Sequence, residues 1–185
     1  MSILAVLAAA AQARTYAVWN SADKGPDITL SGGDLVASVN GPVGVRANMG
    51  KSTGKWYWEV TIGGAGPYWG AGLADASYST ASYPFDPHCS GVQSNGYYWN
   101  VGGTYYSGNA FGVGDVLRFA ADLDAHTLEV YKNATQIAAI SSIQTGVVYP
   151  VAGSYAAGNQ TLTANFGAST FAHSPLSGYN PGWYV

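Results

Sequence analysis

The sequence predicts an all-β protein, built as a two-sheet antiparallel β-sandwich. The most direct sign is Gly114–Asn133, where apolar residues occupy alternate positions on both sides of the short polar segment Asp124–Thr127. Alternation of this kind has the period of strands with one buried face, so the stretch indicates a β-hairpin. The 25 glycines and 14 tyrosines among 185 residues are typical of short strands joined by tight turns. After Ala13 no segment shows convincing helical periodicity.

An apolar run at residues 3–11 is the first element of the chain, and it allows three interpretations. We expect residues 1–14 to form an apolar extension ahead of a sandwich at 15–185. A short alanine-rich helix, about 18 Å long, would need to pack on a neighbouring subunit or on its own domain. We favour the contact with a neighbouring subunit. The side chains that would carry this assembly contact are Ile3, Leu4, Val6 and Leu7. The third interpretation is a signal peptide, because residues 11–13 have the A-x-A form of a cleavage site, although the basic start is missing.

Residues 54–62 form the strongest strand in the first half of the chain. Trp56 and Trp58 fall on one face, together with Val60 and Ile62, and this predicts a large contribution to the core. Glu59 falls on the other face, where we expect it to meet solvent or a backbone donor. The remaining expected strands are 16–19, 28–30, 35–39, 43–48, 68–73, 91–100, 104–106, 136–140, 147–151 and 161–166. We expect loops at 20–26, at 175–185 and at Asp75–Cys89, the last long enough to suggest a functional or mobile segment.

Composition and charge argue against several classes of partner. A net charge of −3 and the lack of a basic stripe argue against nucleic acid. No apolar run approaches the roughly 20 residues that would span a bilayer. Cys89 is the only cysteine, and His88, His126 and His173 show no ligand spacing, so we expect no metal site and no cofactor.

Catalysis is the least favoured of the possible functions, and we predict that the protein is not an enzyme. Asp122 and Asp124, with Asp115 nearby in sequence, could serve as the paired carboxylates of a glycan-cleaving enzyme. Aspartates at turns, however, usually accept hydrogen bonds from backbone N–H groups. The sequence has no nucleophile elbow, no His-Glu-x-x-His motif and no phosphate-binding glycine loop.

Four sequence pieces, taken in order, resemble the SPRY domain family. They are Tyr57-Trp58-Glu59-Val60, then Gly70-Ala71-Gly72-Leu73-Ala74, then the pieces of 114–133 that include Gly114-Asp115-Val116 and Tyr131-Lys132-Asn133, and finally Tyr149-Pro150 with Asn165-Phe166-Gly167. The resemblance covers roughly residues 15–182. Two positions depart from the pattern, because Ala134 replaces a glycine and Val130 replaces an aromatic residue. The upstream segment looks most like SPRY domains of bacterial and phage proteins.

The resemblance implies a concanavalin-like jelly-roll sandwich that binds a peptide or protein segment with loops at one end. Matched by neighbouring motifs, those loops are Asn40–Val43, Gly63–Tyr68, Asp75–His88 and Gly153–Gly158. The expected ligand-binding residues are Pro42, Pro67, Tyr68, Tyr83, Phe85 and Tyr155. Tyrosine suits this role because it offers a large contact area at a low cost in side-chain entropy. A glycan is the rival ligand, since aromatic faces stack on sugar rings and polar side chains crowd the same loops.

We therefore expect a non-enzymatic structural or adhesion protein, a component of a phage virion or phage-like particle, such as a tail, fibre or capsid-decoration protein. Its partners would be neighbouring virion subunits or a host surface receptor, and it would form a homo-oligomer. The low charged fraction, 9%, and the apolar N-terminus support this view. The alternative is an exported bacterial SPRY protein, secreted or periplasmic, that binds a peptide or a glycan.

Overall fold

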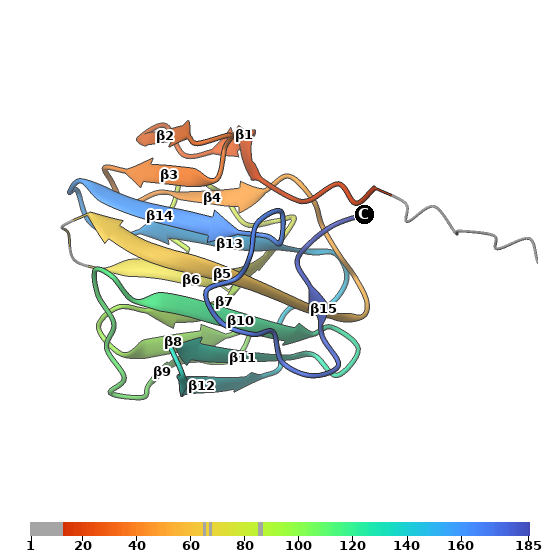
Figure 1. Ribbon diagram of the computed structural model, residues 1–185. Coiled ribbons are helices and arrows are strands. Elements are labelled where there is room, and N and C mark those ends of the chain that lie inside the picture. Colours follow the sequence, from red (N-terminus) through yellow and green to blue (C-terminus); the bar gives the residue numbers. More distant parts are fainter. Residues whose placement is uncertain (1–12, 65, 67, 85–86) are drawn as a thin grey trace, which may run out of the picture.

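The computed structural model describes residues 13–64, 66, 68–84 and 87–185, and these form two β-sheets packed face to face (Figure 1). The predicted all-β sandwich is confirmed, and no helix occurs among the described residues. None of them, accordingly, forms a helix of the length and apolarity that crossing a membrane requires. The helix or extension expected at the N-terminus, with Ile3, Leu4, Val6 and Leu7, lies outside the described residues.

One layer is a seven-stranded antiparallel sheet. In spatial order its strands are β1 (Trp19–Lys24), β4 (Gly44–Ala47), β13 (Val148–Ser154), β6 (Trp69–Asp75), β7 (Cys89–Gln93), β8 (Tyr97–Asn100) and β9 (Gly103–Tyr106). Two sequence predictions need correction here. Residues 20–24 are paired as part of β1 rather than looped out, and the strand expected at 91–100 is two strands joined by a turn at Ser94–Gly96.

The other layer is an eight-stranded sheet. Its path runs through β12 (Thr135–Ser141), β11 (Thr127–Lys132), β10 (Val116–Asp122), β5 (Lys55–Gly64), β14 (Gln160–Asn165), β3 (Val36–Val39) and β2 (Ile28–Ser31), while β15 (Asn180–Pro181) pairs with β5 off this path. The predicted hairpin is β10 and β11, with Phe119 opposite Val130. β5 lies beside β10 and forms the centre of the layer.

The core between the layers is dominated by large aromatic side chains. Trp58 on β5 stacks on Phe119 of β10 at a centroid distance of 4.9 Å, and both are fully buried. Trp19 of the other sheet meets Phe166 edge to face at 5.2 Å. Trp56 is only partly buried and packs at the margin of this core. The expected contribution of the two tryptophans is thus made mainly by Trp58.

The C-terminal segment, residues 168–185, completes the eight-stranded sheet and part of the core. β14 ends its pairing at Glu59, and β15 takes its place beside Trp56 and Tyr57. The chain then turns inward, so that the Trp183 ring lies 5.3 Å from that of Trp58 and is fully buried. A stretch expected to be loop therefore supplies a core side chain.

Candidate binding surface

Three loops, those that contain Asn40, Tyr68 and Tyr155, lie at one end of the sandwich, on the left in Figure 1. The fourth starts at Asp75 and ends at His88 at the opposite end of β6 and β7, and its Tyr83 reaches the other three. Hydrogen bonds join them in sequence-distant pairs. The N–H of Ser154 donates to the carbonyl of Val43 at 3.1 Å, and the N–H of Gly158 donates to Asn40 Oδ1 at 3.1 Å. The N–H of Tyr155 donates to the carbonyl of Tyr68 at 3.2 Å. The loops that the sequence predicted to act together therefore lie together.

The floor beneath these loops is unusually flat because glycines line it. Gly44, Gly153 and Gly70 lie side by side on β4, β13 and β6, and Gln93 on β7 continues the same row. Their positions alternate with buried core residues, so this row faces away from the other sheet. A sheet surface without side chains leaves room for another segment to lie on it closely.

The segment that fills this room, described at residues 76–84, 87 and 88, is here called the covering loop. The Tyr78 hydroxyl packs directly over Gly44, so close that a Cβ on Gly44 would lie only 2.1 Å from it. The same hydroxyl donates to the carbonyl of Ser82 at 2.6 Å. Pro84 lies against Gly153 in the same way, its Cδ 3.0 Å from a Cβ placed there. Tyr78 also joins Cys89 and other buried side chains in a second, smaller apolar cluster. The long loop is therefore packed on the sheet.

Tyr68, Tyr83 and Tyr155 form an aromatic group at the rim of this floor, here called the tyrosine cluster. The Tyr155 ring meets that of Tyr83 at a centroid distance of 4.7 Å and that of Tyr68 at 6.0 Å, both edge to face. Tyr68 and Tyr155 are 39% and 56% exposed, so the cluster presents ring edges and faces to solvent. Edge-to-face packing fixes each ring by its neighbour, which reduces the entropy that binding would cost.

Tyr83 is also held by a hydrogen bond from the sheet, and Tyr68 has a constrained backbone. Gln93 Nε2 donates to the Tyr83 hydroxyl at 2.7 Å. Burial raises the pKa of Tyr83, so its hydroxyl stays protonated in the physiological range. Tyr68 has a φ of 65°, a left-handed backbone conformation that is uncommon for a tyrosine. Strain of this kind persists where surrounding contacts hold it and is often found at binding sites.

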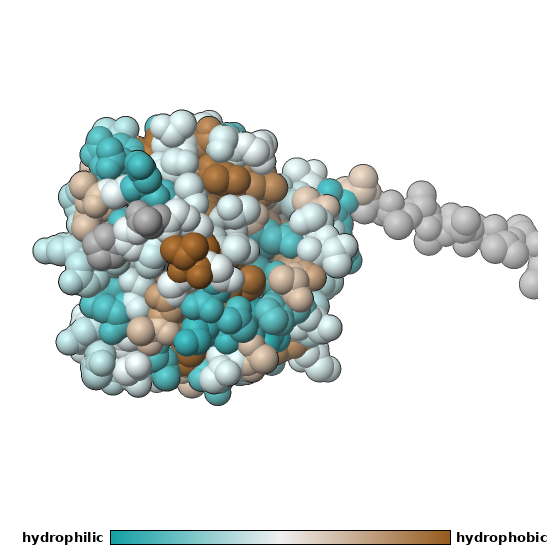
Figure 2. Space-filling model, turned by 60° about the vertical axis from the view of Figure 1, so that its left-hand side comes forward, coloured by the Kyte–Doolittle hydropathy of each residue, from teal (hydrophilic) through white to brown (hydrophobic). Residues whose placement is uncertain are grey.

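The other predicted binding residues have different positions. Pro42 is exposed and immediately precedes Val43, at the edge of the same loop group. Pro67 and Phe85 lie outside the described residues. Figure 2 turns this end toward the viewer, and brown apolar surface appears there only in separate groups between pale and teal side chains. A ligand at this end would therefore meet a surface of interspersed polar and apolar side chains rather than an extended apolar patch.

The sequence did not single out Gln93, Tyr97 or Tyr106 for this surface. β7 pairs with β8 through Gly91–Trp99 and Val92–Tyr98. Continuing this register by one residue places Tyr97 opposite Gln93, in the same outward-facing row. Tyr97 contacts Tyr106 at a centroid distance of 4.9 Å, and Tyr106 is 67% exposed. The only sequence feature that could have indicated Tyr97 and Tyr106 is the high frequency of tyrosine in residues 97–106. Strand register is needed to tell which of these tyrosines face outward.

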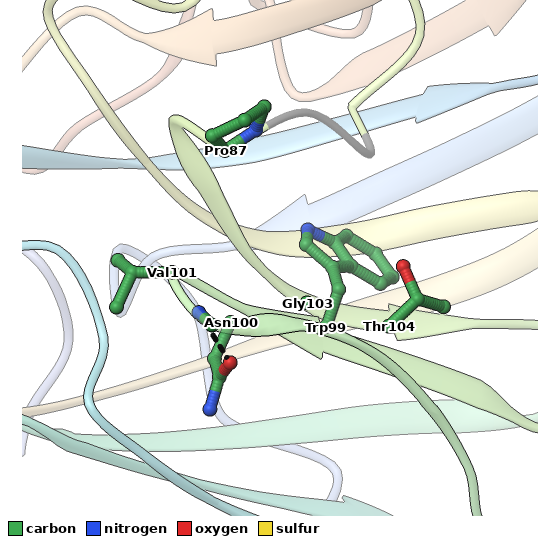
Figure 3. Close-up of a pocket in the computed structure, with 7 residues that line it drawn as sticks. Pro87, Trp99, Asn100, Val101, Gly103 and Thr104 are labelled. Atoms are coloured by element: carbon green, nitrogen blue, oxygen red, sulfur yellow. Dashed lines mark hydrogen bonds between the residues drawn. The ribbon is translucent and has the colours of Figure 1, made fainter.

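A separate pocket of about 290 Å³ lies at the opposite end of β8 and β9, around Trp99 and the Asn100–Gly103 turn (Figure 3). In it the N–H of Gly102 donates to Asn100 Oδ1 at 2.8 Å, which closes the turn. Pro87 stands on the far side of the hollow from the Trp99 indole. Its lining holds no acid, base or thiol, so it offers no group for proton transfer.

The aspartates considered for catalysis hold turns. Asp122 Oδ1 accepts the N–H groups of Asp124 and Ala125, and its other oxygen pairs with Lys55 Nζ at 2.8 Å. Asp124 accepts the N–H of Gly54, and Asp115 accepts the N–H of Gly112. Within the described ranges, no three His, Cys, Asp or Glu side chains group closely enough to bind a metal ion.

Comparisons with known proteins agree with this architecture. A scan of protein families matches the SPRY domain to residues 55–169, more than half of the chain. The crystal structure of the TRIM65 PSpry domain superimposes with a TM-score of 0.66 and 17% identity, covering 82% of this chain and 92% of that one. For the SPRY domain of human HERC1 the TM-score is 0.67 and the identity 13%, over 79% and 96% of the chains. Stonustoxin matches with a TM-score of 0.63 and 18% identity, over 82% of this chain but 27% of its own. No curated protein sequence matches.

Proposed function

The chain belongs to the SPRY domain family, and from this premise we propose that it binds a peptide or protein segment with the tyrosine cluster and its neighbouring loops. SPRY domains are typically protein-interaction modules, which supports binding without catalysis. The turn-holding roles of Asp115, Asp122 and Asp124 point the same way.

One observation carries the proposal: Tyr68, Tyr83 and Tyr155 come from three loops that are far apart in sequence and still contact one another. Exposed, mutually fixed tyrosines are a recurrent feature of protein-binding surfaces. The glycine floor and Gln93 support them, and Pro42, Pro67 and Phe85 belong to the same set of loops. Tyr97 and Tyr106 would extend the contact along the outer face of the sheet.

The test is a peptide selected from a random display library on the full chain, with its affinity measured by calorimetry. We expect Tyr155→Ala and Tyr68→Ala to weaken binding at least about tenfold, roughly 1.4 kcal/mol. The matched control is Tyr105→Ala, because Tyr105 is 42% exposed, much like Tyr68, but sits on the opposite face of its hairpin. The proposal would be refuted if the selected peptides bound Tyr155→Ala and Tyr68→Ala as tightly as the wild type. It would also be refuted if the library yielded no binder.

We further propose that the protein is a structural or adhesion component of a phage virion, with residues 1–14 as its assembly contact and a homo-oligomer as its working form. Support comes from the resemblance of the segment before β5 to SPRY domains of bacterial and phage proteins and from the low charged fraction of 9%. Deleting residues 2–13 should leave a folded monomer that fails to assemble, as measured by light scattering. A deletion variant that assembles normally would contradict this. A mature chain beginning at Arg14 in the native source would instead favour the exported bacterial protein.

A further inference from the structure

A second polar site lies on the outer face of the eight-stranded sheet, whereas the tyrosine cluster adjoins the seven-stranded sheet. Strand register aligns Thr29 of β2, Ser38 of β3 and Thr161 of β14 in one row across this face. Gly63 of β5 ends the row, and a Cβ there would lie 2.4 Å from Thr161 Oγ1. The Thr161 side chain therefore leans over Gly63 and closes the row on the side of β5.

A groove of about 340 Å³ follows this row, here called the hydroxyl groove. It is lined by Asp27, Thr29, Ser38, Asn40, Asn159 and Thr161, among others. Asn40 Oδ1 accepts the N–H of Gly158, and this hydrogen bond fixes the orientation of the Asn40 side-chain amide. Thr161 and Ser38 are half-buried, so the groove has depth as well as polar lining.

Asp27, Thr29 and Asn159 in this lining are exposed, whereas Ser38 and Thr161 are half-buried. Among the described residues, the side chains of Asp27, Thr29, Ser38, Asn159 and Thr161 make no hydrogen bond to the rest of the chain. Hydroxyls and amides can each donate and accept, whereas the carboxylate of Asp27 only accepts. No lysine or arginine lines the groove, so nothing in it would attract a sulfate, phosphate or carboxylate group.

This donor and acceptor set fits a molecule that carries many neutral hydroxyl groups. We propose that the hydroxyl groove binds a neutral saccharide, with Asp27 accepting from sugar hydroxyls and Thr29, Ser38 and Thr161 bonding along the ring. The negative charge of Asp27 would disfavour sialylated and sulfated glycans. This proposal can be tested separately from peptide binding, because none of Tyr68, Tyr83 and Tyr155 lines the groove, although Asn40 belongs to a loop at the same end of the sandwich.

The test is saturation-transfer NMR on the full chain with glucose, galactose, mannose and N-acetylglucosamine, each at about 10 mM. We expect at least one of these sugars to bind, and Asp27→Asn and Thr161→Val each to weaken it about fivefold or more, as the loss of one hydrogen bond predicts. Thr163→Val is the matched control, because Thr163 lies on the same strand and face, two positions beyond the groove. It should leave the affinity unchanged.

Tyr155→Ala separates this site from the peptide site. It should keep sugar binding while losing peptide affinity, and Thr161→Val should do the reverse. The proposal is overturned if none of the four sugars gives a transfer signal, or if Thr163→Val or Tyr155→Ala reduces sugar binding as much as Thr161→Val does.

Discussion

At the level of single residues, Glu59 holds the C-terminal segment against the sheet. The side chain is 2% exposed and accepts the N–H groups of Ala172 and His173 at 2.8 and 3.0 Å. The Tyr57 hydroxyl donates to the same carboxylate at 2.7 Å and accepts from Arg118 Nε. The sequence predicted that Glu59 would meet either solvent or a backbone donor, and the structure confirms the backbone donor. A buried carboxylate is tolerable here because all its near neighbours donate.

Glu59→Gln should destabilise the protein by about 1–3 kcal/mol. The amide keeps the shape of the side chain but replaces one acceptor with an NH₂ group, which then faces a backbone donor. Chemical denaturation would measure the loss, and hydrogen exchange should quicken at residues 170–175. Glu129→Gln, on a half-buried side chain of β11, is the comparison. Equal stability losses in the two variants would argue against the special role of Glu59.

The ion pair of Asp122 with Lys55 should make stability depend on pH. The hydrogen bond from Lys55 lowers the pKa of Asp122 below its ordinary 3.8, and the same contact raises the pKa of Lys55 above 10.5. The stabilising effect is therefore present between these values. It is lost as pH falls through the folded-state pKa of Asp122, and again as pH rises through that of Lys55.

Asp122→Asn keeps the carbonyl oxygen that accepts from Asp124 and Ala125 and removes only the charge. The stability difference from the wild type should be steady at neutral pH and shrink toward zero in strong acid. Urea unfolding across pH 2 to 8, about the range in which carboxylates titrate, would measure it. A difference that does not change with pH would contradict the assignment.

At the level of elements, the covering loop depends on the glycine floor. Gly44→Ala would place a methyl group 2.1 Å from the Tyr78 hydroxyl and force this ring out of its position. We expect a loss of about 1–3 kcal/mol and faster hydrogen exchange through residues 76–84. Gly112→Ala is the control, since nothing lies within 4 Å of its Cβ position. A Gly44→Ala protein with unchanged exchange in this loop would show that the floor is not what orders it.

The C-terminal segment is structural as well, through Trp183. Its indole N–H donates to the carbonyl of Met49 at 2.8 Å, and its ring contacts both Trp56 and Trp58. Trp183→Ala should cost about 3–5 kcal/mol, measured as a lower unfolding free energy. Val185→Ala, at a 70% exposed position two residues on, should change it by less than about 0.5 kcal/mol. Similar values for the two variants would contradict the placement of Trp183 in the core.

These elements show what the sequence could and could not predict. Alternation identified β5, β10 and β11 because apolar side chains stand at every second position, on the face toward the other sheet. It missed the burial of Trp183 and did not identify which backbone donors Glu59 meets, since residues 168–185 have no period and their contacts reach across the chain. Residues 20–24 of β1 were expected to be loop because their sequence, NSADK, is polar, and their pairing is irregular.

At the level of the whole molecule, the two sheets bring together side chains that are distant in sequence. The sequence grouped the loops of Tyr68, Tyr83 and Tyr155 by family resemblance, and the structure places their rings in contact. It gave no reason to include Gln93 or the row of glycines, because strand register alone aligns them. The recognition proposed for this end would thus rest on loops that the sandwich holds in place.

The most direct measurement is amide NMR of the full chain as a selected peptide is added. If this end of the sandwich recognises the partner, the largest shift changes will fall at residues 68, 83, 93 and 155, with smaller ones along 97 and 106. Largest changes on β11 and β12, or at Thr61 and Thr163 on the opposite sheet, would contradict the account.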